Sequence, residues 1–191
     1  RAVTKKAKRT NIAIPSSSET IALWCNQDKH SCNFTLRDAM SNQLLWEDHS
    51  SYVRASCYSP GGNKFIVIRA HHGAVAEVRD LNSGFVDEIL LDSPVGKSNH
   101  LDKCIVNHSG TQIAVRIRKT LESWSLESNS KLFALQNFVS FIFGFSGDDV
   151  YFLVVDQITI AVRSAAVGNK LISIPIENFV SDLAVSANGR M

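Results

Sequence analysis

The residues Gly96-Lys97-Ser98 are of the types that end a phosphate-binding loop. That loop, G-x-x-x-x-G-K-[ST], also needs a glycine five positions earlier, and it joins a strand to a helix so that backbone N–H groups surround the phosphates. Leu91 occupies the glycine position, and the flanking residues predict a loop between two strands. We therefore expect no nucleotide site here, and we interpret residues 92–102 as a long connection that is a candidate for partner contact.

Serine, histidine and aspartate side chains could in principle form a hydrolytic triad, with Ser59, Asp38 and Asp80 as candidates. A nucleophilic serine of the strand-to-helix type lies on a strained turn that a helix follows. No helix is predicted after any serine of this chain, and both aspartates occupy equivalent positions of a repeat, which places them at strand ends. We expect no catalytic residue and interpret the chain as not being an enzyme.

Cysteine and histidine do not show metal-ligand spacing in this chain. The cysteines are Cys25, Cys32, Cys57 and Cys104, without a C-x-x-C pair, and no further ligand stands at suitable spacing around His71-His72. We expect neither a metal nor another cofactor. A disulfide between Cys25 and Cys32 across a hairpin is one alternative, but we favour four buried, reduced thiols because the chain lacks a secretion signal.

The composition is that of an ordinary globular protein: 191 residues, of which 45% are hydrophobic and 20% are charged. This length suffices for one or two domains with a sizeable core. The longest apolar runs, such as residues 150–155, are about six residues long, whereas a membrane-spanning helix needs about 20. The N-terminal residues also lack the layout of a signal peptide. We expect no membrane association and a cytoplasmic location, with the nucleus as the alternative.

Positive charge is concentrated at the N-terminus. The first ten residues hold five basic side chains and no acidic one, although the net charge of the chain is only +2, so the remainder is net negative. Such a segment can bind nucleic acid or act as a nuclear address. No aromatic residue is interleaved with it for base stacking. We therefore interpret residues 1–10 as a basic linker and do not expect nucleic acid as the partner.

The rest of the sequence predicts strands. No long window places apolar residues at i, i+3, i+4 and i+7, as an amphipathic helix would. Short β-branched and aromatic runs recur between clusters of Gly, Asn, Ser and Asp, at residues 65–68, 113–117, 150–155 and 158–162. This pattern is typical of an all-β fold with short strands.

A repeat organises these strands. Its anchor dipeptides are Arg37-Asp38, Arg79-Asp80, Trp124-Ser125 and Arg163-Ser164, at intervals of 42, 45 and 39 residues. Apolar residues alternate around each anchor, which indicates strands with one buried face. The position five residues after the start of each anchor holds Asn42, Gly84, Asn129 or Gly168. Because Gly and Asn most readily adopt a positive φ, a tight left-handed turn is predicted there.

A Ser- or Gly-rich turn precedes each anchor, at Pro15 to Ser18, Tyr58 to Gly62, His108 to Thr111 and Phe145 to Asp148. These markers predict four strands per unit, which is the period of a propeller blade. On these residues, and most clearly at Val78-Arg79-Asp80-Leu81 with Ser83-Gly84, the chain resembles degenerate WD repeats over about residues 11–189. The resemblance implies an all-β propeller segment with four four-stranded antiparallel blades and the first strand of a fifth.

The departures from the WD pattern are informative. Only Trp124 keeps the tryptophan, and only Asp38 and Asp80 keep the aspartate. The hydrogen-bonded His, Ser/Thr, Asp and Trp set of the family is complete in no unit, although His49 and His100 lie near its first position. Apolar packing between blades must therefore hold the fold. Arginine at the tryptophan position of three units is expected to lay its stem on neighbouring strands.

We expect residues 11–191 to form one WD-repeat-like segment, with units of about 11–50, 51–100, 101–136 and 137–176 and a partial unit at 177–191. A lone strand of a fifth blade would leave an open sheet edge. We therefore interpret the chain as a fragment of a longer propeller-bearing protein. A self-contained four-bladed protein is the alternative.

The resemblance implies a scaffold that binds a protein or peptide partner through loops on one face, with no small-molecule cofactor. That face would gather the turns between second and third strands and the connections between blades. The candidate partner-binding residues are Lys29, His30, His49, His71, His72, His100, Arg118 and Lys119. Asp48, Asp156 and Gln157 belong to the same face.

Two alternatives remain beside the scaffold. The chain could be a sensing or autoinhibitory module of a larger multidomain protein, such as a nucleotide-switching ATPase, whose chemistry would lie outside this sequence. An enzymatic propeller would need convergent polar residues on its innermost strands. Those strands here are predicted to hold mostly Ala, Ile, Val, Phe and Ser, which disfavours this second alternative.

Overall fold

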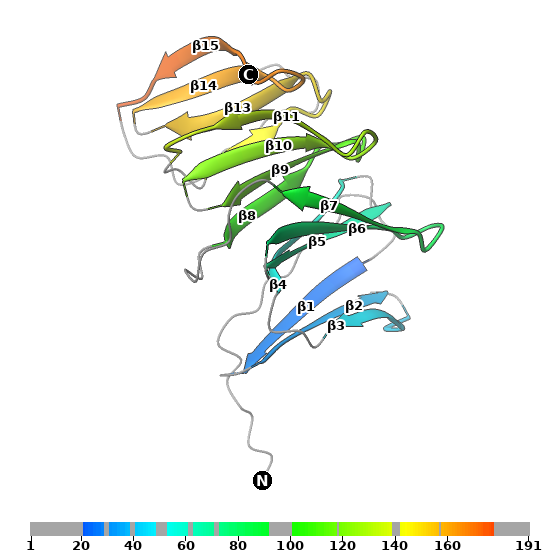
Figure 1. The fold of residues 1–191 in the computed structure, drawn as a ribbon. Helices are drawn as coiled ribbons and strands as arrows, with labels where there is room; N and C mark the ends of the chain where they lie inside the picture. Colours follow the sequence, from blue (N-terminus) through cyan, green and yellow to red (C-terminus); the bar gives the residue numbers. More distant parts are fainter. Residues whose placement is uncertain are drawn as a thin grey trace.

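The structure, a computed structural model, describes residues 21–28, 31–38, 41–48, 53–60, 63–70, 73–91, 101–117, 119–138, 142–156 and 158–177. These residues form fifteen strands, arranged as four antiparallel sheets in chain order (Figure 1). Among them, no helix has the length and apolar character needed to span a bilayer. The all-β prediction is confirmed.

Sheet one contains β1 (Ile21–Asp28), β2 (Ser31–Asp38) and β3 (Leu44–Asp48). Sheet two contains β4 (Val53–Tyr58), β5 (Lys64–Ala70), β6 (Ala74–Asp80) and β7 (Val86–Leu91). Sheet three contains β8 (Leu101–Val106), β9 (Gln112–Ile117), β10 (Thr120–Ser125) and β11 (Ser130–Leu135). Sheet four contains β12 (Phe143–Phe145), β13 (Tyr151–Asp156), β14 (Thr159–Ser164) and β15 (Lys170–Pro175).

Each sheet pairs its strands in sequence order, as the repeat predicted. The described residues form an open row of sheets and not a closed ring (Figure 1). The strand expected near residues 11–14 and the fifth-unit strand expected within 177–191 lie outside the described residues. Residues 92–100 of the long connection also lie outside them, while residues 101–102, which we assigned to that connection, begin β8.

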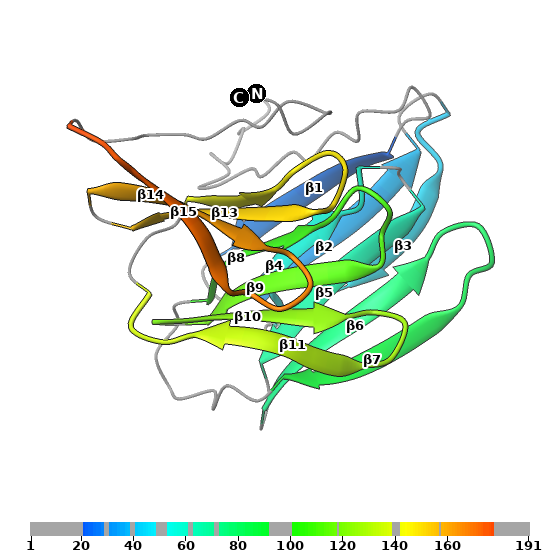
Figure 2. The same cartoon turned by 90° about the horizontal axis from the view of Figure 1, so that it is seen from above.

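Apolar clusters fill the junctions between neighbouring sheets. Leu36, Phe65 and Val67 form the cluster between sheets one and two. Larger clusters lie between sheets two and three and between sheets three and four, and β4 and β8 lie side by side (Figure 2). Phe65 and Phe152 are completely buried, and burial of each contributes about 1.5–3 kcal/mol. The prediction that apolar packing between sheets holds the fold is confirmed.

The Asn or Gly residue that stands five positions after the start of each anchor has the predicted positive φ in all four sheets. The φ angles are 56° at Asn42, 72° at Gly84, 51° at Asn129 and 71° at Gly168. These residues lie in the turns that connect the third and fourth strands of each four-stranded sheet, and β2 to β3 in sheet one. In sheets one, three and four the strand register shifts immediately before the anchor residue, as a β-bulge does.

The turn between the first and second strands is closed by one buried polar side chain in each of sheets two, three and four. The Ser59 hydroxyl accepts a hydrogen bond from Lys64 N at 3.0 Å, and the Ser146 hydroxyl accepts one from Tyr151 N at 2.9 Å. In sheet three the corresponding acceptor is the Asn107 side-chain oxygen, 2.8 Å from Gln112 N. An amide oxygen thus takes in sheet three the place that a serine hydroxyl has in sheets two and four.

Candidate functional site

Two opposite edges of the row carry different turns. The turns that follow β2, β6, β10 and β14 all lie along one edge, on the right of Figure 1. Because the strands are antiparallel, β1, β5, β9 and β13 end at the opposite edge, and β3, β7, β11 and β15 end there as well. We call this opposite edge the partner edge, since the turns and connections predicted to bind a partner follow these strands.

Most of the candidate partner-binding residues lie outside the described residues: Lys29, His30, His49, His71, His72, His100 and Arg118. Lys119 is described, and it lies in the turn between β9 and β10 with an exposed side chain. Its backbone carbonyl accepts a hydrogen bond from Phe138 N at 2.7 Å, which links this turn to the segment after β11. Gln157 lies outside the described residues, and Asp156 ends β13.

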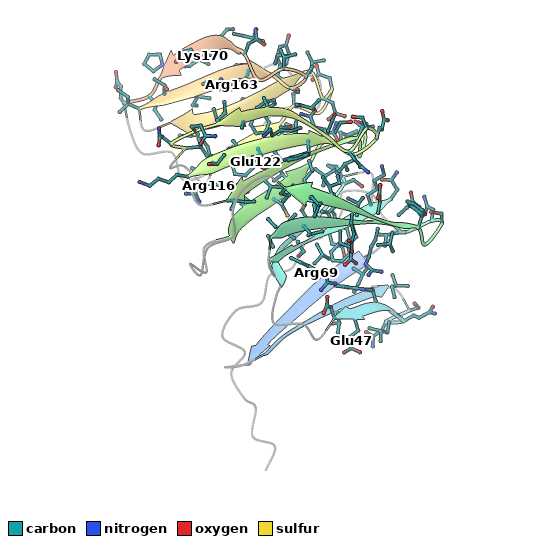
Figure 3. All side chains as sticks on the ribbon, viewed as in Figure 1. Glu47, Arg69, Arg116, Glu122, Arg163 and Lys170 are labelled. Atoms are coloured by element: carbon teal, nitrogen blue, oxygen red, sulfur yellow. The ribbon has the colours of Figure 1, made fainter. Side chains whose placement is uncertain are left out.

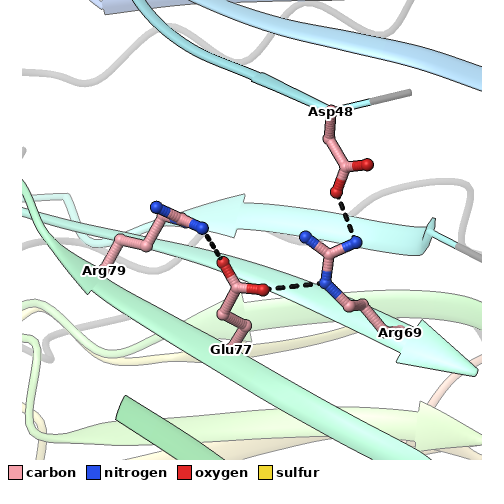
Figure 4. Close-up of polar contacts among 4 residues, drawn as sticks. All are labelled: Asp48, Arg69, Glu77 and Arg79. Carbon is pink, nitrogen blue, oxygen red and sulfur yellow. Dashed lines mark hydrogen bonds and ion pairs between the residues drawn. The ribbon is translucent and has the colours of Figure 1, made fainter. Parts of the chain in front are cut away.

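Asp48, which the sequence placed on the partner face, belongs to a chain of ion pairs between sheets one and two (Figure 4). Its carboxylate pairs with the Arg69 guanidinium, and only 9% of the Asp48 side chain is exposed. Arg69 Nε donates to Glu77 at 2.8 Å, and the other oxygen of Glu77 pairs with Arg79. Two cations and two carboxylates thus neutralise each other in this junction.

The electrostatics of this network favour the charged form of Arg69. Burial by itself lowers the pKa of Arg69, but the hydrogen bond and charge of Glu77, followed by the charge of Asp48, raise this pKa above its usual value. The Arg79 guanidinium carbon lies 5.0 Å from the centroid of the Trp46 ring, a cation–π distance. The structure thus places the guanidinium of Arg79 against the neighbouring sheet, whereas the prediction concerned the stem of the side chain.

The junction between sheets two and three contains two buried, free thiols, Cys57 and Cys104. Burial, and then the hydrogen bond and charge of Cys104, raise the pKa of the Cys57 thiol well above its usual value. The thiolate is the reactive form of cysteine, so Cys57 is a packing residue here. In sheet one, the register opposes Cys25 to Phe34 and Cys32 to Gln27, so these two cysteines are not direct cross-strand partners.

Sheets three and four are joined by polar contacts between residues that are distant in sequence. The Asp149 carboxylate accepts hydrogen bonds from His108 N at 2.7 Å and Ser109 N at 2.8 Å. Gln112 Nε2 donates to the Ala165 carbonyl at 2.7 Å and to the Ser123 hydroxyl at 2.6 Å. Such contacts fix the angle between the sheets and therefore the spacing of the turns at each edge.

The same junction contains a pocket of about 120 Å³. Its polar lining side chains are Gln136, Asn137, Thr159, Arg163, Lys170 and Ser173. The pocket extends from β15 to the residues after β11 and the start of β14, which lie at the partner edge. Sequence analysis did not predict it, because its walls come from two sheets whose relative placement no sequence motif encodes.

The described part of the chain holds no group of three or more His, Cys, Asp or Glu side chains that could bind a metal ion. Ser59 and Asp80, which were considered for a hydrolytic triad, have structural partners. The Ser59 hydroxyl donates to Asn63 at 2.8 Å, and the Asp80 carboxylate accepts from Ser83 N at 2.8 Å. Asp80 therefore closes the turn at the end of its strand, as its place in the repeat predicted.

Comparison with known proteins informs the fold alone. No protein-family model matches the chain, and no curated protein matches it. A chain of the Kuenenia stuttgartiensis hydrazine synthase is similar in structure, with a TM-score of 0.60 and 16% sequence identity. The match covers 86% of this chain and 48% of that chain, so the present chain spans about half of its length. At this identity the likeness shows a shared fold and carries no activity to this protein.

Proposed function

We propose that the chain is part of a WD-repeat-like propeller that serves as a non-enzymatic scaffold for a protein or peptide partner. The observation that supports this most is the row of sheets whose β1, β5, β9 and β13 strands end at one edge. Loops held by a rigid framework lose little conformational entropy when they bind. The apolar clusters and the polar contacts between sheets supply that framework here.

The candidate residues predicted for the partner edge include three cations, Lys29, Arg118 and Lys119, and these would favour an acidic partner. The eight candidate residues are all lysine, arginine or histidine. Charges of one sign along an edge steer an oppositely charged partner and suppress partners of the same sign. The cytoplasmic location and the absence of a cofactor belong to this proposal. The alternative role, as a sensing module of a larger protein, stays a prediction from the sequence.

The proposal is tested by affinity capture with the full chain from a cell extract, followed by quantitative mass spectrometry. The test variant is Lys119→Glu, alone and together with Arg118→Glu. The matched control is Lys131→Glu. Lys131 is also exposed, but it lies at the start of β11, at the edge of the row away from the partner edge. The expected result is a protein that the parent chain and the control retain and the test variants lose.

A captured protein is then purified, and its binding to the three forms of the chain is measured by calorimetry. We expect the Lys119→Glu variant to bind it at least about five times more weakly than the control does. Equal binding by all forms would place the partner elsewhere on the chain. Absence of any specific partner would contradict the scaffold proposal.

A further inference from the structure

We infer that Cys57 of β4 and Cys104 of β8 form a redox-sensitive pair, which peroxide oxidises to a disulfide that fastens sheet two to sheet three. Both thiols are free and buried, with 8% of Cys57 and 6% of Cys104 exposed. They are far apart in the sequence, so only the packing of the two sheets brings them together. Formation of this bridge involves no partner, so it goes beyond the proposed function and does not depend on it.

The two thiols face the same junction from opposite sides. Cys57 belongs to the apolar cluster between sheets two and three, whereas its neighbour Tyr58 packs against the cluster between sheets one and two. Cys104 belongs to the same cluster as Cys57, whereas its neighbour Ile105 packs against the cluster between sheets three and four. Successive side chains of a strand point to opposite faces of the sheet, which explains this arrangement. Side chains of both sheets fill the junction (Figure 3).

The repeat shows independently that these two positions meet. Counted from the residue that closes the turn after the first strand of each sheet, Cys57 and Ile105 occupy one position, and Cys104 and Phe143 occupy another. Between sheets three and four, Ile105 packs against the cluster that contains Phe143. Between sheets two and three the same two positions hold the cysteines. The thiols thus take the place of two larger apolar side chains that pack together.

The small side chains at this junction allow the backbones to approach. In the described part of the chain, β4 and β8 are the two strands from different sheets with the most extensive approach, and their Cα atoms come within 8 Å of one another. Ala55 of β4 packs against the same cluster. The Cys57 and Cys104 side chains are already hydrogen bonded to each other. A disulfide joins Cα atoms about 4.4–6.8 Å apart, so rotation of the side chains with a small approach of the strands is enough to form it.

The surroundings determine how the pair reacts. The other side chains of the cluster are apolar, and burial is the main cause of the raised pKa of the Cys57 thiol. Because the thiolate is the nucleophile, its attack on an oxidant is slow in the folded protein. The disulfide is uncharged and fits apolar surroundings without the desolvation cost of a thiolate. The junction therefore slows formation of the bridge and favours it once it has formed.

The oxidation is a two-electron reaction that hydrogen peroxide completes. The thiolate of one cysteine attacks a peroxide oxygen, the O–O bond breaks, and a sulfenic acid and one water form. The sulfur of the other cysteine then attacks the sulfenic sulfur, so that the S–S bond forms, the S–O bond breaks and a second water leaves. Two thiols and one hydrogen peroxide thus give one disulfide and two waters, which take up both thiol protons. The second step is intramolecular between groups already in contact, so it outpaces reaction with a dissolved thiol.

The bridge would change the stability of the row of sheets. It closes a loop that contains β5, β6 and β7, which removes conformational freedom mainly from the unfolded chain. By linkage, the factor by which the bridge stabilises the folded chain equals the factor by which folding favours the bridge. In a reducing compartment such a disulfide is transient and redox-sensing. The oxidation state of the pair would therefore set how firmly sheets two and three hold together.

The first experiment equilibrates the full chain with mixtures of reduced and oxidised glutathione, folded in buffer and unfolded in urea. Acid stops the exchange, free thiols are alkylated under denaturing conditions, and mass spectrometry of the peptides identifies each bridged pair. We expect the ratio of bridged to reduced Cys57–Cys104 to be at least about thirty times larger in buffer than in urea. An equal ratio in both, or a mixed disulfide with glutathione as the main product, would overturn the inference.

The second experiment measures the consequence for stability. Hydrogen peroxide should bridge the pair on the order of hours and raise the midpoint of thermal unfolding by about 5–10 °C. Dithiothreitol should reverse both changes. Cys104→Ala should abolish the rise. The matched control, Cys32→Ala, removes a cysteine of sheet one and should keep it.

The remaining outcomes also decide the question. An unchanged midpoint in the bridged chain, or the same rise in Cys104→Ala as in the parent, would overturn the inference. A bridge between Cys25 and Cys32 as the main product would overturn it too, because these two are not direct cross-strand partners in the folded chain. Cys57→Ala is the second variant of the pair. Peptide mapping of the parent chain needs no variant, so the identity of the bridge is decided even where the alanine variants do not fold.

Discussion

Phe133 of sheet three lies directly against Gly168 of sheet four. A Cβ atom at position 168 would lie less than 3.0 Å from three carbon atoms of the Phe133 side chain. Gly168 also has a φ of 71°, so both its backbone conformation and its surroundings favour glycine. The turn between β14 and β15 can therefore approach β11 closely enough for the two sheets to form one core.

Replacement of Gly168 should destabilise the folded protein. We expect Gly168→Ala to lower the free energy of unfolding by about 2–4 kcal/mol, since left-handed backbone strain adds to overpacking against Phe133. Gly84→Ala is the matched control, because Gly84 has a φ of 72° but nothing within 4 Å of a Cβ. Its cost should be about 1–2 kcal/mol. Urea unfolding measures both, and equal losses would contradict the packing role of Phe133.

The ion pairs between sheets one and two should be sensitive to the loss of one charge. We expect Glu77→Gln to destabilise the protein by about 2–4 kcal/mol, because Arg79 and Arg69 lose a buried carboxylate partner. Glu88→Gln removes an exposed carboxylate of sheet two and should change stability by less than about 0.5 kcal/mol. Thermal unfolding compares the two variants, and a Glu77 effect as small as that of Glu88 would show that the network contributes no net stability.

Asp80 should make stability depend on pH in the acidic range. Hydrogen bonds from Ser83 N, the Ser83 hydroxyl and Asn82 N lower the pKa of its carboxyl group. Because the folded state has the lower pKa, this stabilisation is present above about pH 3.9, the usual value for aspartate, and is lost as the pH falls through the folded pKa. An NMR titration of the Asp80 carboxyl carbon should show a midpoint below 3.9. Ser83→Ala should raise that midpoint, and an unchanged midpoint would contradict the stated cause.

Cys57 should resist alkylation in the folded protein. Its thiol is buried and has a raised pKa, so little thiolate forms at neutral pH. We expect iodoacetamide to modify Cys57 more than about tenfold more slowly in the native protein than in urea. Mass spectrometry of the peptides that contain Cys57 and Cys104 measures each site separately. Rapid modification of native Cys57 would show that the junction between sheets two and three opens readily.

Features that depend on local backbone chemistry could be predicted from the sequence. Short β-branched runs predicted the strands, and the column of Asn42, Gly84, Asn129 and Gly168 predicted the left-handed turns in all four sheets. These predictions succeed because strand alternation and positive φ constrain residue type at each position separately. The acceptor that closes the turn before β9 is the Asn107 side chain, which the repeat did not single out because sheets two and four use serine there.

The junctions between sheets were decided by tertiary structure. Asp48 and Glu77 are separated by many residues in the chain, yet both bind Arg69, and nothing in either repeat predicts that contact. The pocket likewise combines β14, β15 and the end of β11, which become adjacent only after packing. The sequence by itself therefore determined the strands, their turns and the repeat. Only the packing of one sheet on the next decided which charges neutralise one another, because electrostatic pairing depends on distance in space and not on separation along the chain.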